Sequence, residues 1–144
     1  MSKDAKAVVR RFVEQVQDQH RLDLVDELFD PEYIDHATPG GMPPAAAKHP
    51  VDGFKQFFSG ILSAFPDLRV TLEDQIAEGD KVVTRKRFRG IHSDPFWGVA
   101  PSGKRLELEV IDIFRVKKGR LAEHWAQLDV MALLRQIGAA PPGR

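Results

Sequence analysis

The sequence predicts an α+β fold in which helices come first and a curved antiparallel sheet follows. Apolar residues recur at helical spacing through much of residues 3–65, whereas apolar and polar residues alternate from Leu68 onward. Helices and strands segregated along the chain are typical of α+β domains. Because the sheet must curl to bury the apolar helix faces, we expect a cone with three N-terminal helices packed on its concave face and a short C-terminal helix. No boundary divides the chain, so residues 1–144 are predicted to form one domain.

Three helices are predicted in the first half. Helical spacing of apolar residues runs through residues 3–19. A second, short helix has Asp23 as a suitable N-cap and ends at Pro31. The third ends at Pro66. It carries an apolar stripe, most of which should be core: Phe54, Phe57, Phe58, Ile61, Leu62 and Phe65.

Residues 32–37 between the second and third helices read as a short extended segment. Residues 38–50 are rich in proline and glycine, which indicates a loop and a candidate lid. The second half then predicts strands from Leu68 to the Gly79-Asp80 turn, over residues 81–92, over 104–117 and over 120–128. Asp129 is the expected N-cap of the terminal helix, which Gly138 ends.

The last two strands form a hairpin around Lys117-Lys118-Gly119, where the glycine supplies a positive φ. If Val116 faces Arg120, Asp112 lies directly opposite His124 on an otherwise apolar face. Such a pair is costly to bury unless its members interact, and it is suited to proton transfer. Lys86, between Thr84 and Phe88 on the preceding strand, could reach toward the same face.

The overall composition excludes several function classes. The net charge is zero, which argues against a nucleic-acid partner, and the absence of cysteine excludes disulfides and thiolate chemistry. The five histidines show no metal-ligand spacing, so we expect no metal site. No signal-peptide core or membrane-length apolar run is present, which favours a cytoplasmic protein without a membrane partner.

Several motifs, in order and at family spacing, resemble the SnoaL-like polyketide cyclases, or ester cyclases, of the nuclear-transport-factor-2-like superfamily. The likeness covers nearly the whole chain. The matching segments are Val25-Asp26-Glu27-Leu28-Phe29, Tyr33-Ile34-Asp35-His36, Ala64-Phe65-Pro66-Asp67-Leu68, Glu78-Gly79-Asp80-Lys81-Val82-Val83, Pro101-Ser102-Gly103-Lys104, Ile111-Asp112-Ile113-Phe114-Arg115 and Gly119-Arg120-Leu121-Ala122-Glu123-His124-Trp125.

This resemblance implies chemistry without a cofactor or metal. Family cyclases close a ring of a polyketide ester by an intramolecular aldol reaction, in which a pocket carboxylate takes a proton next to a carbonyl. A related isomerase places its base near the position of Asp35-His36, and a related epoxide hydrolase uses an Asp-Arg-Asp set on late strands. The cyclase aspartate corresponds here to Asp112, to Asp129, or to the position that His124 occupies.

We therefore predict His36, Asp112 and His124 as catalytic residues, with a structural cross-strand pair as the alternative for Asp112 and His124. Asp35 ranks below His36, because it should point the other way in an extended segment. Asp129 is also the predicted helix cap. The predicted substrate contacts are Tyr33, Phe54, Phe58, His92, Phe96, Trp97, Phe114 and Asp129.

Two partners are expected, a hydrophobic small molecule inside the cone and a second copy of the chain. Trp125, Ile111 and Ile113 share the outer sheet face with charged residues, a mixture typical of a homodimer or higher homo-oligomer interface. The leading hypothesis is a cyclase or isomerase that abstracts a proton next to a carbonyl. The alternatives are a non-catalytic small-molecule binding domain and a hydrolase that uses an Asp/His-activated water.

Overall fold

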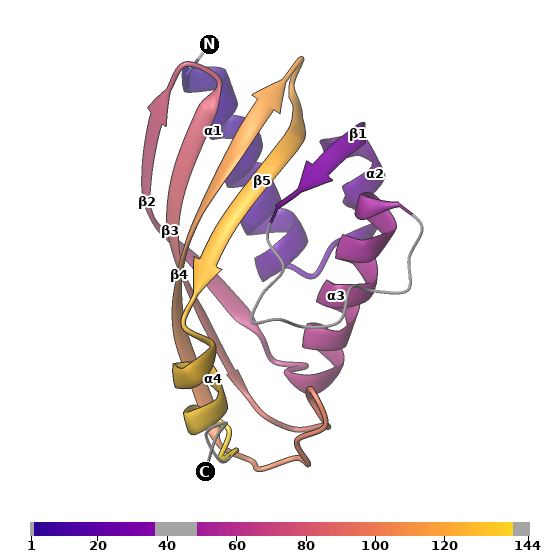
Figure 1. The fold of residues 1–144 in the computed structure, drawn as a ribbon, viewed down its shortest axis with the longest axis vertical. Coiled ribbons are helices and arrows are strands. Elements are labelled where there is room, and N and C mark those ends of the chain that lie inside the picture. The colour runs from indigo at the N-terminus through magenta and orange to yellow at the C-terminus, as the bar shows by residue number, and fades with distance from the viewer. Residues whose placement is uncertain (1, 37–48, 140–144) are drawn as a thin grey trace.

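A computed structural model describes residues 2–36 and 49–139 (Figure 1). The predicted loop over residues 38–50 and the C-terminal tail lie mostly outside the described residues. The element order confirms the predicted succession of helices and strands. The elements are α1 Ser2–Arg11, η1 Phe12–Asp18, η2 Leu22–Leu24, α2 Val25–Leu28, β1 Phe29–Asp35, α3 Pro50–Ala64, β2 Arg69–Glu78, β3 Lys81–Ile91, β4 Arg105–Lys117, β5 Arg120–Leu128 and α4 Val130–Gln136.

The five strands form one curved, unclosed sheet in the order β1-β5-β4-β3-β2. The four long strands are antiparallel, as predicted, but β1 runs parallel to β5. A parallel pair needs a long connection, which the chain between β1 and β5 supplies. The short strand β1 thus extends the predicted four-stranded antiparallel sheet by one parallel strand.

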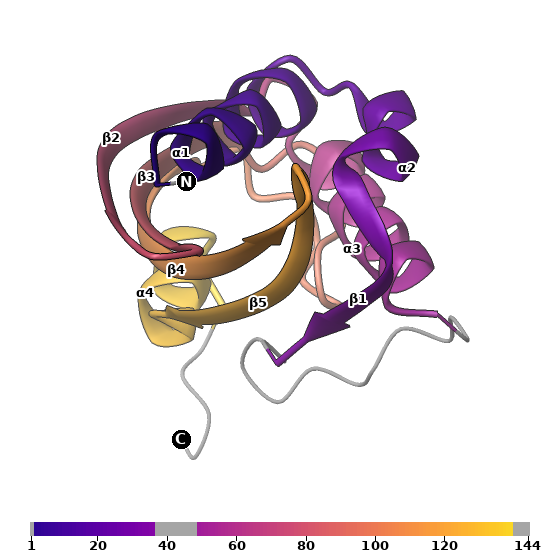
Figure 2. The ribbon, with the colours of Figure 1, turned by 90° about the horizontal axis from the view of Figure 1, so that it is seen from above.

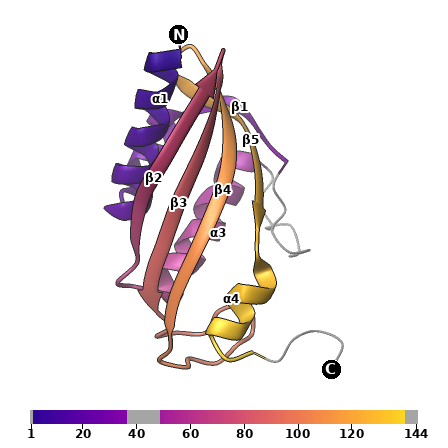
Figure 3. The same ribbon diagram turned by 90° about the vertical axis from the view of Figure 1, so that its left-hand side faces the viewer.

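The N-terminal helices cover the concave face of the sheet. Seen from above, the sheet curls around α1, and α3 lies on its open side next to β1 (Figure 2). Seen from the left-hand side of Figure 1, the outer face shows β2, β3 and β4, with α3 behind them and α1 along the β2 edge (Figure 3). These views confirm the predicted cone.

The first predicted helix is continuous, but its second half is the π-helix η1. This segment buries four residues, including one polar side chain, against the sheet: Phe12, Val13, Val16 and Gln17. Aromatic contacts extend this core, because the Phe12 ring lies 5.6 Å from Phe29, 5.5 Å from Phe54 and 5.2 Å from Phe114.

Two predicted helix boundaries are wrong and one is confirmed. Asp23 does not cap the second helix, because the guanidinium of Arg21 donates to both of its carboxylate oxygens. Pro31 lies inside β1 rather than at a helix end, since α2 ends at Leu28. Asp129 does cap α4, where its Oδ1 accepts a hydrogen bond from the Ala132 N–H at 2.9 Å.

The register of the β4–β5 hairpin differs from the prediction by two residues. Lys117 pairs with Arg120 around a two-residue turn, and an irregularity between Arg115 and Val116 shifts the pairing further. Asp112 consequently faces Ala126, and His124 faces Phe114. The predicted direct opposition of Asp112 and His124 is wrong. The two side chains still share the concave face as diagonal neighbours.

Candidate active site

His124 lies between two carboxylates from different strands. Its Nε2 is 3.0 Å from Asp112 Oδ2 on β4, and its Nδ1 is 3.2 Å from Asp35 Oδ1 on β1. Parallel pairing of β1 with β5 sets Asp35 opposite His124 and brings the second carboxylate into reach. The side chains are 15% exposed for His124, 26% for Asp35 and 3% for Asp112, so Asp112 forms the inner end of the triad.

The inner end of the triad continues into the core through Lys86 on β3. The Lys86 Nζ lies 2.9 Å from Asp112 Oδ2 and donates to Gln17 Oε1 at 3.0 Å. The side chain of Lys86 is only 2% exposed, which confirms that it reaches inward. Its ammonium group lies over the rings of Phe12, Phe88 and Phe114 at 5.4–5.9 Å.

Tyr33 completes the outer end. Its phenolic O–H donates to Asp35 Oδ2 at 2.9 Å, and its ring packs edge-on against Phe29. Burial, together with the adjacent carboxylate of Asp35, raises the pKa of the Tyr33 phenol, so it remains a hydrogen-bond donor. We call Tyr33, Asp35, Lys86, Asp112 and His124 the acid–base cluster.

The cluster favours a protonated His124. Burial alone lowers the pKa of the imidazole, but hydrogen bonds and charge from Asp112 and Asp35 outweigh it and raise the pKa above its ordinary value. Burial likewise raises the pKa of Asp112, yet Lys86 and His124 together bring it below the ordinary value. An imidazolium can donate to a carboxylate at each ring nitrogen, whereas a neutral ring cannot. Two cations thus balance two carboxylates.

Aromatic and aliphatic side chains surround the cluster on the concave face. The Phe114 ring lies 4.3 Å from the His124 ring, and Phe54 stacks on Phe58 at 5.6 Å. Phe54, Phe88 and Leu128 remain partly exposed although they pack against the core. Apolar side chains of this kind are the usual lining of a site for a hydrophobic ligand.

His36 does not join the cluster. Its Nε2 lies 2.6 Å from Glu123 Oε2, and its ring stacks on Trp125 at 5.1 Å. Since successive residues of a strand point to opposite faces, Asp35 turns inward and His36 outward. We ranked His36 above Asp35 because the two side chains should point in opposite directions. They do so, but Asp35 is the one that contacts His124, whereas His36 contacts Glu123.

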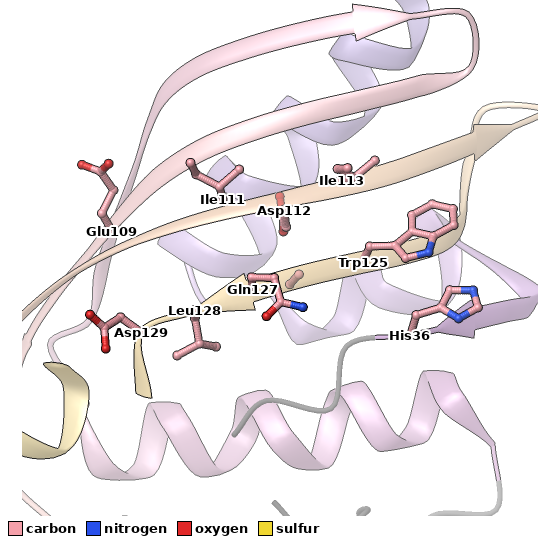
Figure 4. Close-up of a pocket in the computed structure, with 10 residues that line it drawn as sticks. His36, Glu109, Ile111, Asp112, Ile113, Trp125, Gln127, Leu128 and Asp129 are labelled. Carbon is pink, nitrogen blue, oxygen red and sulfur yellow. The ribbon is translucent and has the colours of Figure 1, made fainter. Parts of the chain in front are cut away.

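A pocket of about 570 Å³ lies along β4 and β5. Figure 4 shows Ile111 and Ile113 on one side of β4 and Asp112 directed to the other, so the pocket is largely on the outer face. His36 and Asp129 both line it, and of the cluster residues Asp112 alone does so. Its lining comprises His36, Glu109, Ile111, Asp112, Ile113, Trp125, Ala126, Gln127, Leu128 and Asp129.

His92, Phe96 and Trp97 form a separate aromatic group at the far end of the sheet. The fully buried His92 contacts Ser102 through Nδ1 at 2.9 Å and lies 5.6 Å from the Phe65 ring. Phe96 stacks on Trp97 at 4.6 Å. None of the contacts of these three residues reaches His124 or Asp112.

The sequence predicted that Asp112 and His124 interact, which the structure shows, but not that Asp35 contacts His124 as well. The missing signal was the parallel pairing of β1, because it alone brings Asp35 beside a strand that is 89 residues away. Lys86 was noted as inward-facing but not as a partner of Asp112. Its position between Thr84 and Phe88 on one face of the predicted strand was the signal in the sequence for an inward-facing lysine.

Within residues 2–36 and 49–139, no group of three or more His, Cys, Asp or Glu side chains is arranged to hold a metal ion. Among the helices in those ranges, none is long and apolar enough to cross a membrane.

The chain folds into an α+β cone that holds the acid–base cluster, and known proteins share this fold. The family model for SnoaL-like polyketide cyclases matches residues 7–137, so the chain belongs to that family. TsrD from Streptomyces laurentii is 29% identical with a TM-score of 0.82, over 96% of this chain and 97% of that one. IdmH from Streptomyces antibioticus is 30% identical with a TM-score of 0.78, over 94% and 99%. No curated protein matches the chain significantly by sequence.

Proposed function

We propose that this protein is a cofactor-independent cyclase that abstracts a proton next to a carbonyl of a hydrophobic, polyketide ester-like substrate and closes a ring by an intramolecular aldol reaction. The observation that carries the proposal is His124 held between Asp35 and Asp112 beside a partly accessible aromatic lining. Family membership supports the substrate class.

The division of labour follows from the contacts. Asp35 is the most exposed of the three triad members and makes the longer contact to His124, so it is the carboxylate that a substrate can reach. Asp112 is buried and bound to Lys86, and it orients the imidazole. The His124 imidazolium then supplies a fixed positive charge for an enolate oxygen, which is where charge develops in this reaction.

The reaction balances within these groups. The Asp35 carboxylate takes a proton from the carbon next to the carbonyl, and the positive charge of the nearby His124 imidazolium stabilises the enolate oxygen. The enolate carbon forms a bond to a second carbonyl carbon of the same molecule. The oxygen of that carbonyl takes up the proton from Asp35, which returns the carboxylate to its starting state. A polar base in an apolar site is suited to such a transfer.

The experiment uses acyclic esters with a methylene between two carbonyls, incubated in deuterium oxide and followed by NMR. Wild-type protein should accelerate exchange at the methylene and ring closure. Asp35→Asn and His124→Gln should each slow both by about 10²–10⁴-fold, the usual contribution of one acid–base group. Asp30→Asn is the matched control, because Asp30 lies on the same strand and, within the described contacts, accepts a hydrogen bond from the Glu32 backbone N–H rather than from the cluster. His36→Gln should retain turnover, and its loss would place the chemistry on the outer face instead.

A hydrolase is the second candidate, because the partial exposure of Asp35 also lets water reach the cluster. Incubation in oxygen-18 water separates the two, since only hydrolysis must incorporate the label. A non-catalytic binding domain predicts a third pattern, in which His124→Gln lowers the melting temperature while ligand affinity and a zero exchange rate stay unchanged.

A further inference from the structure

We infer that Lys86 is a positioning residue that keeps Asp112 ionised and thereby holds the mobile proton of the cluster on His124. This inference rests on the proposed function for its catalytic meaning, but its physical content concerns only the chain's own groups. Lys86 touches neither His124 nor Asp35 in the contacts described, and acts through Asp112.

The first argument is the geometry of one oxygen. Asp112 Oδ2 receives both Lys86 Nζ at 2.9 Å and His124 Nε2 at 3.0 Å. Within the described contacts, the other oxygen of Asp112 is buried and has no hydrogen-bond partner. Within the described contacts, the ionised carboxylate is stabilised through Oδ2, so loss of either cation removes one of its two charged partners.

The second argument is the charge of the whole cluster. Among the described residues, the groups that contact one another around His124 and Asp112 come from four strands: Tyr33 and Asp35 from β1, Lys86 from β3, Asp112 from β4 and His124 from β5. With Lys86 charged, the cluster is neutral when His124 carries the single shared proton and both aspartates are ionised. Without that ammonium, the same protonation state leaves a net negative charge in a buried site. A second proton on Asp112 would relieve it.

The third argument is how firmly Lys86 is held. The buried Gln17 accepts a hydrogen bond from Lys86 Nζ at 3.0 Å, and three phenylalanine rings surround the ammonium group of Lys86. Gln17 lies in the π-helical segment η1, and such segments are frequent at functional sites. These contacts hold the long Lys86 side chain in one conformation, in which its ammonium group lies against the carboxylate of Asp112.

The test compares Lys86→Met with Lys117→Met, an exposed lysine at the end of β4. Infrared difference spectra at neutral pH should show the carbonyl band of a protonated carboxyl group in Lys86→Met. The band should be absent from wild type and Lys117→Met, and should disappear when Asp112→Asn is added. In turnover assays, the acidic limb of the pH profile should move to higher pH by about one unit or more, a tenfold change in proton affinity.

Each result decides the inference. A folded Lys86→Met protein without the band, and with an unshifted titration of the His124 ring nitrogens by NMR, would overturn it. If Lys86→Met does not fold, adding Asp112→Asn should restore folding, because the unpaired charge is then gone. Failure of that rescue, with Asp112→Asn alone folded, would also overturn it. The spectra need no turnover, so a failed cyclase assay leaves this test intact.

Discussion

At the scale of residues, the site depends on charge balance rather than on any single side chain. His124 has a carboxylate at each ring nitrogen, and Lys86 offsets the inner one. The sequence predicted the Asp112–His124 association because an acid and a histidine on one apolar face must interact. It could not predict Asp35 as the third member, since that contact depends on how a strand far away in the chain pairs with β5.

The raised pKa of His124 predicts a pH dependence of stability. A group whose pKa is raised in the folded state adds stability that is fully present below its unfolded value, here 6.5, and is lost as pH rises through the folded value. The free energy of unfolding should therefore fall as pH increases above about 6.5. Urea titrations at stepped pH measure it.

His124→Gln should remove most of this decrease in the free energy of unfolding at alkaline pH. His36→Gln, on the outer face, should retain the decrease. Asp112 contributes with the opposite sign. Its lowered pKa gives stability that is present above its unfolded value of 3.8 and is lost as pH falls through the folded value. A wild-type protein whose stability does not change between pH 6 and 9 would contradict the protonated state assigned to His124.

At the scale of elements, the β4–β5 turn sets the register of the site. Lys118 and Gly119 both have positive φ, at 51° and 76°, as a two-residue hairpin turn requires. A Cβ at Gly119 would meet nothing within 4 Å, so a substitution there is strained only through the backbone. Gly60 in α3 also has open space around it, but has helical backbone angles.

This pair of glycines gives opposite predictions for the same chemical change. Gly119→Ala should lower the free energy of unfolding by about 1–2 kcal/mol, the cost of a left-handed conformation for an L-residue. Gly60→Ala should raise it by about 0.5–1 kcal/mol, because alanine is the better helix former. Chemical denaturation measures both. If both substitutions changed the free energy of unfolding by the same amount and in the same direction, backbone conformation would not control the effect at these sites.

Element positions were largely predictable because apolar periodicity follows burial on the sheet and helix faces. The stripe of Phe54 and Phe58 gave α3, and alternation from Leu68 gave β2. Pairing was less predictable. The two-residue turn and an irregularity beside Val116 together moved the register, and neither this shift nor the parallel direction of β1 leaves a mark in the periodicity.

At the scale of the whole molecule, the outer sheet face carries an apolar row across four strands. The register aligns Ile76, Val83, Ile113 and Trp125, and Ile111 beside them is 50% exposed. The neighbouring charges are paired within the chain, since Arg85 and Arg87 both bind Glu73. The row is therefore flanked by neutralised groups, which favours contact with another apolar surface over contact with a charged one.

We propose that two copies associate through this row, as the sequence predicts, because a two-fold axis lets one apolar row cover another and the zero net charge does not oppose association. Sedimentation velocity should show a dimer for wild type. Ile111→Glu should weaken it by more than about tenfold, since burying an unpaired carboxylate at an interface is costly. Met131→Glu, an exposed apolar residue on α4, is the control and should leave the dimer intact. A wild-type monomer at high concentration, or equal weakening by both variants, would rule out this face.

Because the acid–base cluster lies on the opposite side of the sheet, the monomeric variant should keep its His124 titration, which separates assembly from chemistry.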